Sequence, residues 1–288
     1  MADRILAEAD WTAAERAHRA RVETFLEPRH SPCGDGHPVW DFLFRYYSLR
    51  PRQLRVWHPG FGVVLGGEGA RRYLDRGGYG AHPCGVTVTD EHLLSRLDTV
   101  RFIARLLAST AGRPAQLNCF GLHEWAMVYR APTVRHQRVP LRLGAAGTDA
   151  VVESMPLRCS HFDAFRFFTE PAARRNAFAP TRREQAGWEQ PGCVHANMDL
   201  YKWCYKLGPL IESELLVDCL ELAAEARELD MRASPYDLTA YGFAPIAIEE
   251  PAGRAEYARR QRAVSDAATP LRQALRDRCD LLLDAARG

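Results

Sequence analysis

The spacing of apolar and polar positions predicts a mainly helical chain. From Ser213 to Arg232, apolar residues recur every three or four positions, which is the spacing that buries one face of a helix. These positions are Leu215, Cys219, Leu222, Ala226 and Leu229. We interpret this stripe as hydrophobic core rather than as a cofactor-binding face.

Helical patterns also cover most of the remaining chain. Thr12 and Glu15 have the spacing of a capping box, which predicts that a helix begins there and ends near Leu26. Pro270 is expected to kink or divide the C-terminal helix. Further helices are predicted over residues 39–49, from Thr89 or Asp90 to Ala111, over 122–129, from 193 onward and over 256–286.

A smaller extended component is expected beside these helices. Residues 60–85 are rich in glycine. Val63-Val64-Leu65 within this segment and Val86-Thr87-Val88 directly after it are strand candidates. Residues 139–143 and 150–153 are further candidates. The chain is therefore predicted to be mainly α, a helical bundle-like single domain over residues 1–288 with a small β component (α+β).

Composition and charge narrow the class of protein. The 288 residues are 47% hydrophobic and 26% charged, enough for a substantial core, and the net charge of +2 is below that of a domain that binds nucleic acid mainly through phosphates. Because no apolar run has the length of a signal peptide or of a membrane span, we expect no membrane partner and a cytoplasmic location. The eight cysteines form no C-x-x-C pair, so we expect mostly reduced, buried thiols.

Groups able to bind a metal or move protons concentrate between residues 158 and 206. If the segment after Gly192 is helical, His195 and Asp199 lie one turn apart on one face, and Lys202 extends the same stripe. Apolar residues alternate with this stripe, which favours a site over a solvated surface. The predicted site is centred on His161, Asp163, Glu189, His195 and Asp199.

Other polar groups join this site or have local roles. His37 and Asp41 either face the site or make local hydrogen bonds at a helix start, which is the favoured alternative. Adjacent His123 and Glu124 in an apolar helix need partners, so they either pair structurally or belong to the site. His58, after Trp57 in a turn, is a weaker candidate for a pocket.

One hypothesis is a non-haem metal enzyme acting on a small molecule. Imidazoles and carboxylates from separate helices can converge on one or two divalent transition-metal ions, namely iron, manganese or zinc. A facial triad needs two histidines and one carboxylate, and a dinuclear site needs more carboxylates. The candidate ligands are His123, Glu124, His161, Asp163, Glu189, His195 and Asp199.

A second hypothesis is metal-free hydrolysis of an N-glycosidic bond. An ionised Asp or Glu would stabilise an oxocarbenium-like transition state and orient water, while a histidine or an acid assists departure of the base. The candidate catalytic residues are Asp163, Glu189, Asp199, His195 and Lys202. Aromatic rings would stack on an extruded purine, although core packing is the favoured alternative for any one ring. The candidate substrate-binding residues are Trp57, His58, Trp125, Arg158, Arg166, Tyr201 and Trp203.

Three sequence motifs carry a family resemblance. They cover residues 118–130, which include Leu122-His123-Glu124-Trp125, residues 158–168, which include His161-Phe162-Asp163, and residues 230–238. With these motifs the chain resembles, over almost its whole length, a bacterial family common in actinobacteria whose members usually carry the label 3-methyladenine DNA glycosylase. The resemblance implies release of a damaged purine base from DNA or a nucleoside. A non-enzymatic nucleotide-binding or protein-binding module is the least favoured class, because binding alone does not require so many acids and imidazoles.

Overall fold

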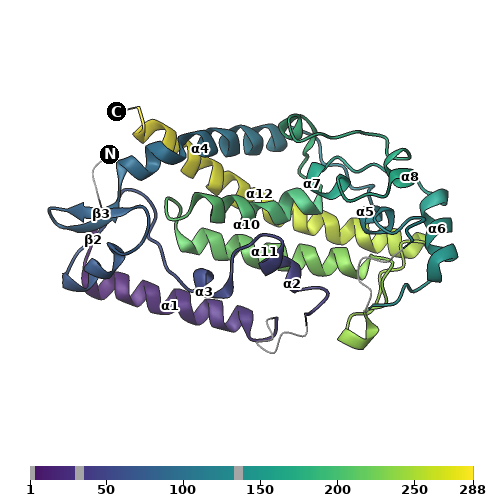
Figure 1. Cartoon of the computed structure of the whole chain (residues 1–288), viewed down its shortest axis with the longest axis horizontal. Coiled ribbons are helices and arrows are strands. Elements are labelled where there is room, and N and C mark those ends of the chain that lie inside the picture. Colours follow the sequence, from purple (N-terminus) through teal and green to yellow (C-terminus); the bar gives the residue numbers. More distant parts are fainter. Residues whose placement is uncertain (1–3, 30–35, 133–138, 288) are drawn as a thin grey trace. The chain divides into compact units, whose positions relative to one another are not determined.

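The computed structural model describes residues 4–29, 36–132 and 139–287, which fold mainly as helices with a small sheet (Figure 1). The predicted mainly α, α+β class is therefore confirmed. Cys33 lies outside the described residues. The chain divides into two compact units, the first formed by Met1–Arg105, Leu200–Glu221 and Leu271–Gly288, the second by Leu106–Asp199 and Leu222–Pro270. The single-domain organisation stays a prediction.

The first unit contains a mixed sheet with the strand order β1-β2-β4-β3. Strand β1 pairs in parallel with β2, whereas β4 is antiparallel to both β2 and β3. Gly85 allows the close approach of β4 to β2, since a Cβ atom there would lie 2.0 Å from the carbonyl oxygen of Leu65. The strands are β1 (Arg4–Leu6), β2 (Val63–Leu65), β3 (Tyr79–His82) and β4 (Gly85–Val88). The predicted strands at 63–65 and 86–88 are confirmed.

Helix α1 (Glu8–Leu26) begins beside this sheet, as Figure 1 shows in purple. Its end is predicted correctly, but the predicted capping box is wrong. The helix begins four residues before Thr12, whose hydroxyl donates to the carbonyl oxygen of Glu8 instead of capping a terminus. Buried Trp11 anchors the helix by donating from Nε1 to the carbonyl oxygen of Gly66 at 2.8 Å.

The predicted helix over 39–49 is also corrected. It is confined to α2 (Asp41–Arg45), and the chain then turns through Ser48, which has a φ of 63°. Pro51 opens the short helix α3 (Pro51–Leu54) rather than ending one, in agreement with the preference of proline for the first helical turn. The 3₁₀ helix η1 (Glu68–Tyr73) follows β2.

Four long helices agree with the predicted periodicity. Thr89 caps α4, because its hydroxyl accepts from the backbone N–H of His92 at 3.1 Å. The apolar stripe predicted for α11 is buried. Pro270 does not divide α12, which also begins earlier than predicted, at Pro251. The four helices are α4 (Asp90–Ala111), α10 (Val194–Leu207), α11 (Ser213–Arg232) and α12 (Pro251–Ala285).

Short helices joined by turns form much of the second unit; Figure 1 shows several of them in teal. The predicted strand at 150–153 is wrong, because Val151 and Val152 lie in α6 with their side chains buried. At 139–143 the extended pairing is limited to a bridge between Leu141 and Tyr236. The short elements are α5 (Leu122–Ala126), α6 (Gly144–Ser154), α7 (Phe162–Phe165), α8 (Glu170–Ala173), α9 (Gln185–Trp188) and η2 (Thr239–Tyr241). Across the described ranges, no helix has the length and apolar character needed to cross a bilayer.

Candidate metal centre

A first group of potential metal ligands surrounds His161 in the second unit. His161 precedes α7, Glu189 follows α9, and Asp199 lies on α10. The Nε2 atom of His161 lies 3.3 Å from Oε1 of Glu189 and 3.3 Å from Oδ2 of Asp199. All three side chains are at most 2% exposed. One imidazole and two carboxylates therefore present ligand atoms to a single point.

A second group lies around His123 and has the composition of a facial triad. His123 from α5, His195 from α10 and Asp230 from α11 offer two imidazoles and one carboxylate within 4.8 Å of one another. The Nε2 atom of His123 is 2.5 Å from Oδ1 of Asp230, whose side chain is fully buried. This geometry is that of a strong imidazole–carboxylate hydrogen bond.

His195 connects the two groups. Its ring centroid is 4.4 Å from that of His123 and 5.3 Å from that of His161. Because His195 and Asp199 are one turn apart on α10, the same helix face contributes to both groups, as the sequence predicts. Three histidines and three carboxylates thus form one continuous buried centre.

A buried guanidinium supports the second group. Arg227, which is 2% exposed, donates from Nη1 to Glu124 at 3.0 Å and to Asp230 at 3.2 Å. Burial disfavours the imidazolium form of His123, but the charge of Asp230, its hydrogen bond and the charge of Glu124 outweigh burial and raise the pKa of His123. Asp230 therefore lies between the His123 imidazole and the buried Arg227 guanidinium and contacts both.

The segment that carries Glu189 is fixed by backbone-directed hydrogen bonds. Arg113 donates to the carbonyl oxygens of Glu189 at 2.8 Å and Ala186 at 2.6 Å. Gly192 lies so close to Gln116 that a Cβ atom would be 2.6 Å from its carbonyl oxygen. These contacts fix the backbone on either side of the Glu189 carboxylate, which itself accepts from the side-chain amide of Gln185 at 2.5 Å.

The segment that leads to His161 is fixed in a similar way. The Asn176 amide accepts from the backbone N–H of Cys159 at 2.8 Å and donates to its carbonyl oxygen at 2.9 Å. This reciprocal pair fixes residues 158–161 to the turn after α8. The backbone that leads to His161 is thereby held from outside the centre.

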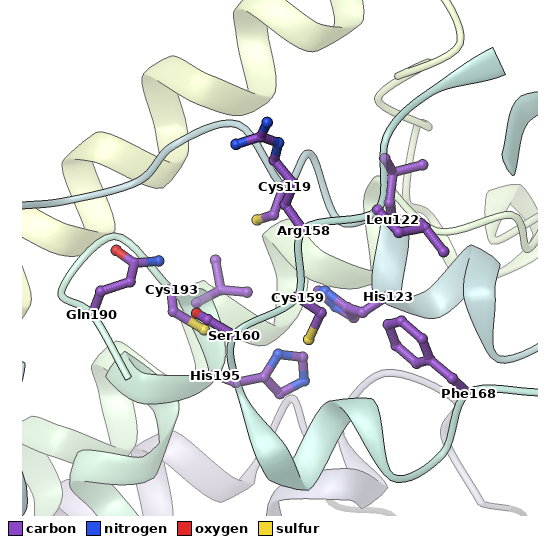
Figure 2. A pocket seen from close by; sticks show the side chains of 12 residues that line it. Cys119, Leu122, His123, Arg158, Cys159, Ser160, Phe168, Gln190, Cys193 and His195 are labelled. Carbon is purple, nitrogen blue, oxygen red and sulfur yellow. The ribbon is translucent and has the colours of Figure 1, made fainter. Parts of the chain in front are cut away.

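A pocket opens onto two of the histidines, His123 and His195 (Figure 2). It encloses about 400 Å³ between atoms, counting its opening to solvent. The lining residues are Cys119, Leu122, His123, Leu157, Arg158, Cys159, Ser160, Phe168, Gln190, Cys193, Val194 and His195. A small molecule in this pocket would therefore contact imidazoles of the buried centre.

Three cysteines line the same pocket. Burial raises the pKa of the Cys119 and Cys193 thiols, and it raises the pKa of Cys159 to about 12. At neutral pH these side chains are neutral thiols. They contribute a soft, weakly polar surface to the pocket.

Two predicted ligands lie outside the two groups. Asp163 forms ion pairs with Arg166 at 3.3 Å and Arg182 at 3.6 Å, and the Arg166 guanidinium also covers the ring of Phe167. Glu124 pairs with Arg227, so it belongs to the supporting network. The two groups of potential ligands therefore do not include Asp163 or Glu124, whose metal-binding role stays a prediction.

The predicted stacking residue of the second unit has a structural position. Trp125 is fully buried and donates from Nε1 to the carbonyl oxygen of Ala233 at 2.8 Å. This placement favours the core-packing alternative for Trp125.

The remaining predicted residues belong to the first unit. Tyr201 is buried against Tyr47, Trp203 is buried against Phe102, and Trp57 donates to Glu214. His58 shares a hydrogen bond with the hydroxyl of Tyr79, and Lys202 lies 4.4 Å from the Trp203 ring centroid.

At the start of α2, the Nδ1 atom of His37 accepts from the backbone N–H groups of Val39 and Trp40, while Asp41 pairs with Arg45. His37 thus makes the local hydrogen bonds of the favoured alternative.

Sequence reasoning missed Asp230 and Arg227. Both lie on α11, and with Ala223 they follow the i, i+4, i+7 spacing of a helical stripe beside the predicted apolar face. Two opposite charges on that stripe are a signal for a buried ion pair. The partner of Asp230, His123, is 107 residues away in sequence, and no local pattern reveals it.

Comparison with known proteins adds no family assignment. Neither a protein-family model nor a curated protein nor a solved structure matches this chain.

Proposed function

We propose that the protein is a metal-dependent enzyme that acts on a small molecule and holds divalent transition-metal ions in the two adjacent groups. The observation that carries the proposal is the convergence of three imidazoles and three carboxylates, all at most 7% exposed, in one centre. Iron, manganese and zinc bind such nitrogen and oxygen ligands.

The ligand atoms of the first group support this proposal. The Nε2 atom of His161 lies 3.3 Å from a carboxylate oxygen of Glu189 and 3.3 Å from one of Asp199, and all three side chains are at most 2% exposed. A divalent cation could bind the imidazole and both carboxylates at this point.

The second group supplies a supporting shell of the kind found around metal sites. Ligating histidines commonly donate their other ring nitrogen to a carboxylate, which fixes the ring. Asp230 has this position beside His123 and is itself bound by Arg227. His123 would then bind the ion through Nδ1 with Asp230 as its partner, or Asp230 would bind directly. A bound ion would supply Lewis-acid or redox chemistry, and the pocket would admit the substrate beside His123 and His195.

Elemental analysis of the untagged protein tests the proposal. We expect iron, manganese or zinc bound at near-stoichiometric levels after purification or reconstitution, and a large loss in both His161→Ala and Asp199→Asn. His82→Ala, which removes a histidine from β3, is the matched control and should keep the metal. Cobalt(II) absorption adds a readout of ligand binding that does not depend on turnover.

Full metal content in both variants, or no binding after reconstitution, would overturn the proposal. Purine release, implied by the family resemblance, stays a prediction. It would gain support if metal-free protein released purine from alkylated DNA and Asp199→Asn abolished that release without loss of fold.

A further inference from the structure

The residues that line the pocket differ in charge from those of the adjacent centre of histidines and carboxylates. None of the twelve lining residues is an aspartate or glutamate, although three carboxylates lie in the adjacent centre. Apart from the two imidazoles, Arg158 is the lining residue that carries a charge at neutral pH. A ligand here therefore meets a positive or neutral surface, which favours an anion.

Arg158 is available to a ligand. Its side chain is exposed, and it makes no hydrogen bond or ion pair with residues 4–29, 36–132 or 139–287. Its backbone is nevertheless fixed, because the Asn176 amide bonds both backbone groups of the next residue, Cys159. In Figure 2 the Arg158 guanidinium and the His195 ring lie at opposite ends of the labelled set.

Apart from Arg158 and the two imidazoles, the pocket lining is mainly apolar. Leu122, Leu157, Phe168 and Val194 line it, together with the three cysteines. This lining excludes water from a hydrocarbon body and offers it no charged partner.

We infer that the pocket binds a small carboxylic acid, with its carboxylate on Arg158 and its apolar body directed toward His123 and His195. This inference rests on the proposed function, because it names the substrate class of that site. A planar guanidinium matches a carboxylate with two parallel hydrogen bonds. One arginine balances the single charge of a carboxylate, whereas a phosphate monoester near neutral pH carries up to about two negative charges.

Calorimetric titration of the metal-loaded protein with matched ligands tests the inference. The probes are phenylacetate and hexanoate, their neutral amides, and phenyl phosphate. A charge-assisted hydrogen-bond pair corresponds to roughly 10- to 100-fold in affinity, so each carboxylate should bind more tightly than its amide by that factor. Arg158→Gln should remove the difference and Arg158→Lys should restore part of it. Arg183→Gln removes another exposed arginine of the same unit and should leave the difference unchanged.

Metal content measured on the same samples separates the two proposals. Equal affinity for acids and amides, absence of carboxylate binding, or a carboxylate preference unchanged in Arg158→Gln would overturn this inference while the metal remains bound. Tighter binding of phenyl phosphate than of phenylacetate would overturn the assignment to a monoanion. Loss of metal from the wild-type protein would instead overturn the proposed function.

Discussion

Both units contain buried or half-buried histidines, but they surround them with different partners. In the first unit, His18 contacts the carbonyl oxygen of Leu54 at 2.8 Å and His58 contacts the hydroxyl of Tyr79 at 2.9 Å, and burial lowers the pKa of each. In the second unit, histidines face carboxylates and one another, and the pKa of His123 is raised. A neutral partner makes a buried imidazole a structural residue, whereas a cluster of imidazoles and carboxylates provides the ligand set of a cation.

The largest effect is expected where the two groups meet. His195→Ala should lose the metal of the second group, of which His195 is a ligand, and weaken binding in the first group, whose His161 ring it adjoins, whereas His161→Ala should affect mainly the first group. Metal content per chain measures the difference. His58→Asn, in the first unit, should keep the wild-type content. Full metal content in His195→Ala would contradict the conclusion that the histidines of the second unit are metal ligands.

The next largest effect concerns the guanidinium that supports the second group. Arg227→Met leaves Glu124 and Asp230 buried without their shared cation, and loss of one partner from a buried ion pair costs about 3–5 kcal/mol. Urea unfolding of apo protein measures this free energy. The double variant Arg227→Met/Glu124→Gln should recover part of the loss. Stability close to wild type in Arg227→Met would show that the network is not essential to the fold.

The outcome along the chain shows which features sequence patterns can predict. Long periodic helices such as α11 are predicted with their ends, because each turn repeats the same apolar signal. The short apolar run Val151-Val152 is ambiguous between strand and helix, and tertiary packing places it in α6. The Thr12 capping pattern fails because the helix extends before it.

Within the site too, residues on one helix can be predicted from sequence spacing, whereas contacts between distant segments cannot. The one-turn spacing of His195 and Asp199 is visible in the sequence because one helix carries both residues. The inclusion of Asp230 and the exclusion of Asp163 depend on which segments meet in space. Residue type and helical spacing therefore single out five of the six residues of the centre, and tertiary contacts decide that Asp230 is the sixth.

A smaller effect is expected for the pH dependence of the free energy of unfolding that His58 contributes. Burial lowers the pKa of His58 to about 4, and the charge of Arg76 adds to this shift. Since the unfolded chain takes up a proton near the ordinary pKa and the folded chain does not, stability is complete above about pH 6.5 and falls as the pH decreases toward 4. For this part-buried group we expect roughly 1–2 kcal/mol between about pH 7.5 and pH 5. Urea unfolding at both pH values measures it, and an unchanged pH slope in His58→Asn would contradict the assignment.

The smallest effect comes from an arginine that is geometrically similar to Arg227. Arg21 also binds two carboxylates, Asp218 and Glu221, each at 2.7 Å, but its side chain is 38% exposed whereas that of Arg227 is 2% exposed. Water solvates the ions that remain after its removal, so Arg21→Met should cost about 1 kcal/mol or less. The difference between the two variants should also persist in high salt, which screens the exposed pair more than the buried one. Equal losses in Arg21→Met and Arg227→Met would mean that burial does not decide the strength of these networks.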